Sequence, residues 1–195
     1  SLSNTSWSLA YYKNDYKDFI AYEYLFPPIQ GVLQVQYQNL GSVETNGVEF
    51  ESKTVFNDNF SASFGLSLNE GKEDDGYLDS LSPDHAKISL SWISDSGRLR
   101  WNTNSTLMKS SRSTLTPVCS RSGICSPAQE TAGRVTLDTY LNFDITKKVN
   151  IKFGVRNLTD VKYWDYPTVA GQAEGTADEY LMPGRNMSFS IKYTL

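Results

Sequence analysis

The sequence has little of what enzymes and metal sites are built from. It contains one histidine, His85, and two cysteines. It has no Ser/His/Asp arrangement, no paired-carboxylate motif and no phosphate-binding glycine loop, so we do not expect an enzyme. No run of about 18 apolar residues occurs, which excludes a transmembrane helix. The net charge of −4 argues against nucleic acid as a partner, because such proteins present a basic face.

The sequence also does not begin with a signal peptide. An alternating pattern of apolar and polar residues begins at Trp7, almost directly after Ser1. We therefore expect a fragment or a cleaved product of a longer protein.

The two cysteines, Cys119 and Cys125, lie close together in a polar, turn-rich segment. A close pair in a loop predicts a disulfide formed in an oxidising compartment. The alternative is a zinc site, but no histidine or further cysteine lies nearby, so no metal site is predicted.

Alternation of apolar and polar residues is what the sequence does have. Met187–Leu195 is the clearest case, with apolar or aromatic residues at every odd position and polar residues at every even one. A period of two predicts a strand with one apolar face and one hydrophilic face. The pattern recurs in about nine predicted strands: 7–11, 19–24, 32–56, 60–68, 85–92, 99–107, 135–143, 149–155 and 187–195.

The first part of the chain alternates less cleanly. A polar connection at 13–18 is expected to separate the first two strands, and Pro27 and Pro28 to end the second. A bulge is expected within 32–56, where Gly41 and Gly47 interrupt the pattern.

The connections between the predicted strands alternate in length. They are short at 57–59, 94–98 and 145–148, and long at 69–84, 109–132 and 157–184. Short turns at one end and long loops at the other are typical of outer-membrane barrels. A soluble β-sandwich shows the same alternation of faces, with the apolar face packed inward, but does not require its long loops at one end. We predict an all-β, antiparallel transmembrane β-barrel with its apolar face in lipid.

Aromatic and charged residues fit this arrangement. The 12 Tyr, 4 Trp and 9 Phe would supply aromatic girdles, and Trp92 and Trp101 are predicted to face each other across a hairpin near a membrane interface. Glu49, Glu51 and Lys53 are expected to face the lumen.

Three segments resemble TonB-dependent outer-membrane receptors. Asn39–Gly41 followed by Asn46–Glu51 is similar to one of their strand motifs, and Gly154–Tyr163 to their penultimate strand and its loop. Pro183–Asn186 and the alternating tail resemble their final strand. The chain departs from the family by ending on Leu195 instead of an aromatic residue, which keeps an apolar terminus.

The resemblance implies that residues 1–195 are the C-terminal part, about the last nine strands, of a barrel with about 22 strands. The plug domain and the N-terminal strands would lie upstream. The lumen-facing residues Glu49, Glu51 and Lys53 would then either contact the plug or line a solvated wall. It also implies a location in the bacterial outer membrane, with the lipid, the plug domain and the TonB complex as partners.

The last long loop is most similar to the haem and haemoglobin receptor branch of the family. The resemblance therefore implies uptake of an iron-bearing ligand, haem or one obtained from a host haem or iron protein, with haem as the transported ligand and no cofactor. Ferric-siderophore and transferrin-type receptors are alternatives within the family. A surface-binding or adhesion barrel without transport is the alternative of another class.

Four residues are candidates for ligand contact. Tyr163, Trp164 and Tyr166 could stack on a planar ligand, or could be girdle or loop-packing aromatics. His85 could be an axial haem ligand, or a polar wall residue. None of the haem-binding histidines of the resembled branch maps onto it.

Overall fold

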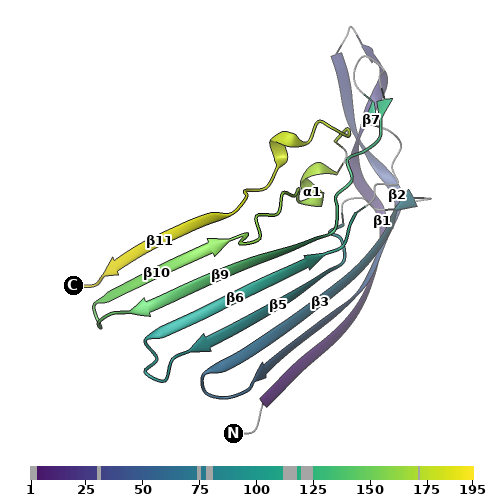
Figure 1. Ribbon diagram of the computed structural model, residues 1–195. Helices are drawn as coiled ribbons and strands as arrows, with labels where there is room; N and C mark the ends of the chain where they lie inside the picture. The colour runs from purple at the N-terminus through teal and green to yellow at the C-terminus, as the bar shows by residue number, and fades with distance from the viewer. Residues whose placement is uncertain are drawn as a thin grey trace.

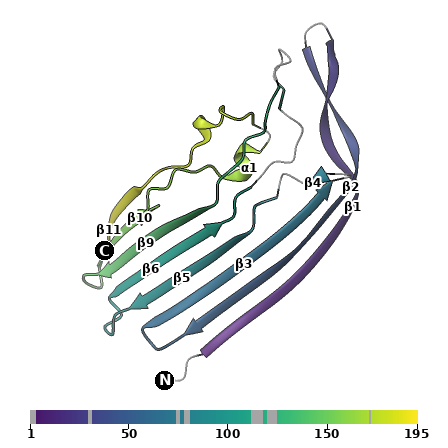
Figure 2. The same ribbon diagram turned by 45° about the vertical axis from the view of Figure 1, so that its right-hand side comes forward.

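The computed structural model describes residues 4–29, 32–73, 76–77, 81–111, 118–119, 125–170 and 172–195. Its main element is one curved antiparallel sheet in which neighbouring strands follow one another along the chain (Figures 1 and 2). The main strands are β1 (Asn4–Ile29), β2 (Val32–Val55), β3 (Phe60–Glu73), β5 (His85–Ile93), β6 (Leu99–Met108), β9 (Arg134–Asp144), β10 (Val149–Arg156) and β11 (Asn186–Tyr193). The predicted antiparallel all-β fold is confirmed.

Short elements occupy the connections. β4 (Gly76–Tyr77) extends the sheet beside β3, and β7 (Val118–Cys119) pairs with β8 (Cys125–Ser126). The connection between β10 and β11 contains a helix, α1 (Tyr166–Val169), and a 3-10 helix, η1 (Asp178–Tyr180). Among the described residues, no helix is both long enough and apolar enough to cross a membrane.

A single register places the apolar residues of all eight main strands on one face. Because directly paired residues share a face, the pairs Leu9–Phe50, Phe64–Ile88 and Phe153–Phe189 extend this face from β1 to β11. Trp92 and Trp101 are direct partners, as predicted. Along this outer face the apolar side chains are exposed, for example Leu9 by 63% and Phe189 by 64%, so the face has no covering layer within the described residues.

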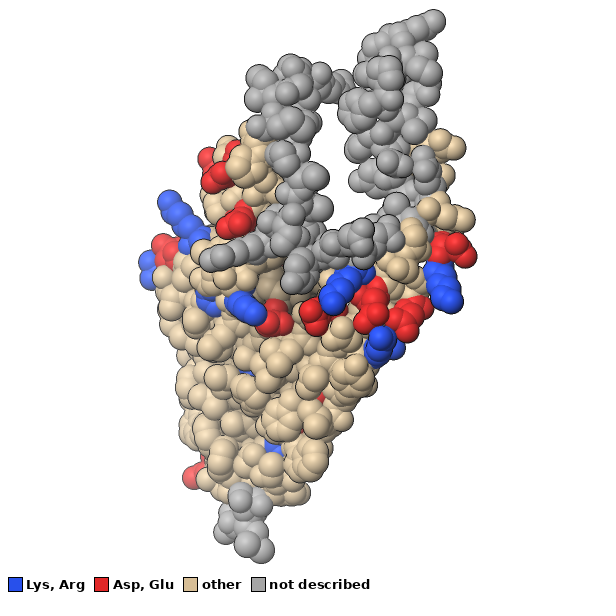
Figure 3. Space-filling model, turned by 90° about the vertical axis from the view of Figure 1, so that its right-hand side faces the viewer, with Lys and Arg blue, Asp and Glu red and all other residues tan. Residues whose placement is uncertain are grey.

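The apolar face ends abruptly towards the long loops. On β1 it runs through Trp7, Leu9 and Tyr11, and the next position on that face is Lys13, whose Nζ lies 3.1 Å from a Glu44 carboxylate oxygen. Figure 3 shows Lys, Arg, Asp and Glu side chains gathered in a band above a surface with few charges. This charged band marks the outer boundary of the apolar surface.

The expectation of two strands before residue 25 is wrong. Residues 13–18 continue β1 and pair with β2 from Asn46 to Ser42, interrupted only at Asp18, whose φ is +55°. Lys13, Asp15 and Lys17 alternate along one side of this ladder, from the charged band outward. Lys, Asn and Asp are depleted in strands, but strand formation depends largely on context, and here the pairing with β2 continues through them.

Other boundaries also differ from those expected. No register shift occurs where a bulge was predicted, near Gly41 and Gly47; the shift lies at the hairpin tip between Leu25 and Ile29. Pro27 and Pro28 lie inside that irregular stretch and do not end β1 before it. β3 extends to Glu73, because Asn69–Glu73 pair with β2 from Gly47 to Val43.

Candidate functional site

The polar face of the sheet is the inner wall of the curved structure, and it carries a hollow. This hollow has a volume of about 550 Å³ and is lined mainly by inner-face residues of β1, β2, β3 and β5. Gly65 lies between its direct partners Glu51 and Lys87, and no atom lies within 4 Å of the position that a Cβ would take there. The missing side chain therefore helps to form the hollow.

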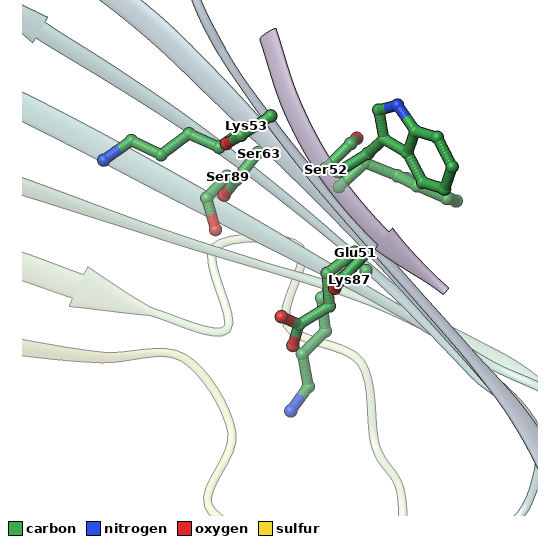
Figure 4. A pocket seen from close by; sticks show the side chains of 11 residues that line it. Glu51, Ser52, Lys53, Ser63, Lys87 and Ser89 are labelled. Atoms are coloured by element: carbon green, nitrogen blue, oxygen red, sulfur yellow. The ribbon is translucent and has the colours of Figure 1, made fainter. Parts of the chain in front are cut away.

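Charged side chains extend into this hollow. Figure 4 shows Glu51 and Lys87 lying alongside each other, with Lys53 pointing away from them. All three are exposed, and among the described residues none of the three makes an ion pair. The prediction that Glu51 and Lys53 face inward agrees with the register, whereas contact with a plug stays a prediction.

Side-chain contacts join the outer ends of the strands on the inner face. The Tyr12 hydroxyl donates to Asn69 Oδ1 at 2.8 Å, and the Asn69 backbone N–H donates to Asp84 Oδ1 at 3.0 Å. Lys109 Nζ then reaches Asp84 Oδ2 at 2.9 Å. These contacts connect β1, β3 and the ends of β5 and β6, and fix the rim from which the loops leave.

Two tyrosines lie across glycines of the neighbouring strand. Tyr12 pairs with Gly47, and a Cβ at Gly47 would lie 2.6 Å from the Tyr12 hydroxyl oxygen. Tyr140 pairs with Gly154, where a Cβ would lie 2.9 Å from a Tyr140 ring carbon. These positions require glycine because of the close approach of the ring.

At the opposite end, near the short turns, the inner face is a paired polar cluster. Arg100 Nη1 lies 2.9 Å from Asp144 Oδ2, and Asn150 Nδ2 donates to both Asp144 and Asn142. Arg98 donates to the backbone carbonyls of Asp144 and Ile145. The cluster ties the 94–98 turn to the ends of β9 and β10.

His85 lies on the inner face at the outer end of β5, between its partners Ser67 and Met108. Its Nδ1 is 3.2 Å from the Pro83 carbonyl oxygen. No group of three or more potential metal ligands occurs among the described residues. A ligand role for His85 stays a prediction.

The predicted aromatic ligand contacts lie in the loop between β10 and β11. The Tyr166 side chain is buried, with 2% exposure, so its ring cannot stack on a ligand in this arrangement. The Trp164 indole N–H donates to the Ala177 carbonyl at 2.7 Å, and the Tyr163 ring lies under the Arg134 guanidinium. Tyr163 and Trp164 are half-buried and retain a surface that a ligand could reach.

The backbones of Cys119 and Cys125 are direct antiparallel partners in the β7–β8 ladder. Their side chains lie outside the described residues, so the disulfide stays a prediction. Direct partners in such a ladder have Cα atoms about 4.5–5.5 Å apart, within the range that a disulfide spans.

Two functional residues were not anticipated. Arg134 and Asp138 lie on the inner face at the outer end of β9, and both contact the last loop. The sequence does show that both residues are charged, occupy inner-face positions of the alternating pattern and directly follow a long loop.

The sequence and the fold were compared with known proteins. The β-barrel family model described as "TonB dependent receptor-like, beta-barrel" matches residues 1–158. No curated protein matches the sequence. Similar solved structures include the copper transporter OprC, with a TM-score of 0.76 and 18% identity over 98% of this chain and 30% of that one.

Two further solved structures are similar. The FrpB iron transporter from Neisseria meningitidis has a TM-score of 0.71 and 17% identity, over 97% of this chain and 29% of that one. The pyoverdine receptor FpvA from Pseudomonas aeruginosa has a TM-score of 0.73 and 17% identity, over 98% of this chain and 27% of that one. The chain thus spans less than a third of each of these proteins, and their likeness shows a shared fold. Given the family model's match, the chain belongs to the β-barrel family of TonB-dependent receptors.

Proposed function

We propose that this chain is the C-terminal part of an outer-membrane TonB-dependent receptor that takes up an iron-bearing ligand. The observation that carries the proposal is the division of one continuous sheet into an exposed apolar outer face and a hollowed, charged inner face. In this proposal the chain supplies part of the barrel wall and of the outer loops.

The apolar face has the dimensions of a membrane-spanning surface. On β3 it runs from Phe60 to Leu68, a distance of about 27 Å along the strand, or roughly 21 Å when tilted by ~40°. This agrees with the ~25 Å apolar band of outer-membrane barrels. Trp92 is 37% exposed on this face near the short turns, which is where aromatic residues meet the membrane interface.

Two ligand classes are supported. The last long loop resembles that of the haem and haemoglobin receptor branch, which favours haem, either free or taken from a host protein. The solved relatives are described as copper, iron and ferripyoverdine proteins, and the iron and ferripyoverdine descriptions support a ferric siderophore equally well.

Uptake experiments separate these classes and test transport itself. In the source bacterium, cells lacking the gene, and cells lacking TonB, would be given radioactive iron as haemin or as ferripyoverdine. If the receptor transports, iron uptake from at least one of these two sources must depend on both the gene and TonB. Ligand binding that is lost with the gene, while uptake is unaffected by either deletion, would instead indicate an adhesion barrel.

The inner hollow is proposed to contact the plug domain of the same receptor. The charges of Glu51, Lys53 and Lys87 would find complementary partners there, since they have none among the described residues. Replacing Lys87 with Met in the full receptor should loosen the plug, measured as increased sensitivity of cells to a large antibiotic. Replacing exposed Lys147, in a short turn, should not.

The cysteine pair is proposed to form a disulfide that closes the β7–β8 hairpin. Mass spectrometry of the unreduced receptor should find Cys119 and Cys125 in one cross-linked peptide. Two free thiols in the oxidised, purified protein would refute it.

A further inference from the structure

The described residues that flank β9 and β11 in the last two long loops, 125–133, 157–170 and 172–184, fold together as one unit. Ala128 and Ala173 form an antiparallel β-bridge, and the Gln129 N–H donates to the Gln172 carbonyl at 2.8 Å. In return, the Glu174 N–H donates to the Pro127 carbonyl at 2.8 Å. Each loop therefore supplies backbone hydrogen bonds that the other needs.

This unit has its own small core. Five side chains from the two loops are among the most buried in the described part of the chain. They are Ala128, Thr131, Tyr166, Val169 and Ala177. Val169 is 0% exposed and Ala177 is 1% exposed. We call residues 125–133, 157–170 and 172–184 together the cap.

The cap lies over the inner face of the sheet. Asp138 and Arg134 are on the inner face of β9, four residues apart, and both reach cap residues. The Asp138 carboxylate accepts the Asn157 backbone N–H at 2.8 Å, where φ is +49°. Figures 1 and 2 show α1 beside the outer end of β9. The cap therefore covers part of the mouth of the curved wall.

Arg134 makes the densest set of contacts to the cap. Its side chain is only 7% exposed, and its Nη1 donates to the Trp164 carbonyl at 2.9 Å. Its Nη2 donates to Asp165 Oδ1 at 3.1 Å, and its guanidinium lies 4.3 Å from the Tyr163 ring centroid. A buried arginine is unfavourable unless its charge and donors are satisfied, and here three successive cap residues satisfy them.

We infer that Arg134 is a positioning residue that holds both loops as a single cap over the mouth of the lumen and sets the orientation of Tyr163 and Trp164. Its effect on uptake rests on the proposed function, whereas its effect on the cap does not. Substrate moving towards the lumen would meet a surface whose shape depends on one guanidinium.

Hydrogen exchange in the full-length receptor tests the inference. In Arg134→Met, amides in 128–131 and in 163–182 should both exchange faster, by about tenfold or more and by a similar factor, because charge-assisted bonds from a buried group are lost. Arg134→Lys should give a smaller increase, since a lysine can still pair with Asp165. Arg156→Met is the matched control, because Arg156 is exposed on the same face of neighbouring β10 and makes no ion pair among the described residues.

Acceleration confined to 163–182 would show that the loops are independent and would overturn the inference, as would unchanged exchange in both segments. Gel mobility before and after heating verifies that each variant has folded as a barrel. If Arg134→Met fails to fold, Asp165→Asn serves instead, because Asp165 is 45% exposed and its replacement should raise exchange in both segments more weakly. The same two outcomes would then overturn the inference.

A cross-link provides an independent check. Cysteines at the bridged positions Ala128 and Ala173 should form a disulfide that leaves uptake of haemin or ferripyoverdine at its wild-type level if the cap acts as one unit. Loss of uptake on oxidation, restored by reduction, would overturn it. If the wild-type receptor takes up neither probe, the proposed ligand class fails while hydrogen exchange still decides the cap.

Discussion

Placing an arginine at Phe64 is the most informative perturbation of the wall. Phe64 is the middle residue of the apolar stretch Phe60–Leu68 on β3, with Ser52 and Ile88 as its direct partners. Its ring lies 6.1 Å from the Phe50 ring, centroid to centroid. If the outer face meets lipid, Phe64 lies near the middle of the bilayer, where an arginine costs about 2–4 kcal/mol. This corresponds to a decrease of roughly 30- to several-hundred-fold in the folding equilibrium constant.

The neighbouring substitution Ser63→Arg is the control. Ser63 faces inward and lines the 550 Å³ hollow, so an arginine has space and water. Its direct partner Lys53 adds a like-charge repulsion of about 1 kcal/mol or less. The assay is urea unfolding of the full-length receptor in lipid vesicles, with the folded fraction read by heat-dependent gel mobility. Equal losses for the two variants, or a larger loss for Ser63→Arg, would refute the assignment of the faces.

Further predictions concern the glycines and the charged band. Gly154→Ala should destabilise the receptor by about 1–3 kcal/mol, because the new Cβ would meet the Tyr140 ring; Gly65→Ala, with open space, should change stability by less than about 1 kcal/mol in the same urea assay. The hydrogen bond to the Glu44 carboxylate, and to a smaller extent the charge of Asp15, raise the pKa of Lys13 above its ordinary value of 10.5. The interaction therefore stabilises the fold below pH 10.5, and this contribution is lost as the pH rises through the raised pKa. NMR titration of methylated lysines should show a lower pKa for Lys13 in Glu44→Gln, and an unchanged pKa would contradict the pairing.

The strands within the apolar band were predictable because one apolar face and one polar face impose a strict period of two. Met187–Leu195 and the hairpin holding Trp92 and Trp101 show this, and the structure pairs both as expected. From the charged band outward that constraint ends. The polar residues 13–18 therefore carry no alternating pattern that predicts a strand, although the backbone ladder continues through them.

The cap was not predictable for a different reason. Arg134 is bonded to residues about thirty positions further along the chain, in a loop with no periodic pattern. An aromatic residue in a loop, such as Tyr166, predicts a ligand contact, but in the cap Tyr166 is a core residue. A periodic sequence pattern reveals an environment that recurs every second residue along a strand. The cap instead depends on individual contacts that no repeating pattern reveals.

The central claim is that one face of this sheet contacts membrane lipid and the other does not. The most direct measurement is a spin-label scan of Phe60–Leu68 in the full-length receptor embedded in a bilayer. Labels at 60, 62, 64, 66 and 68 should be accessible to oxygen dissolved in lipid and shielded from a water-soluble nickel complex, while labels at 61, 63, 65 and 67 should be shielded from the lipid-dissolved oxygen. Equal accessibility of both sets to the water-soluble complex, with no period of two, would contradict the claim.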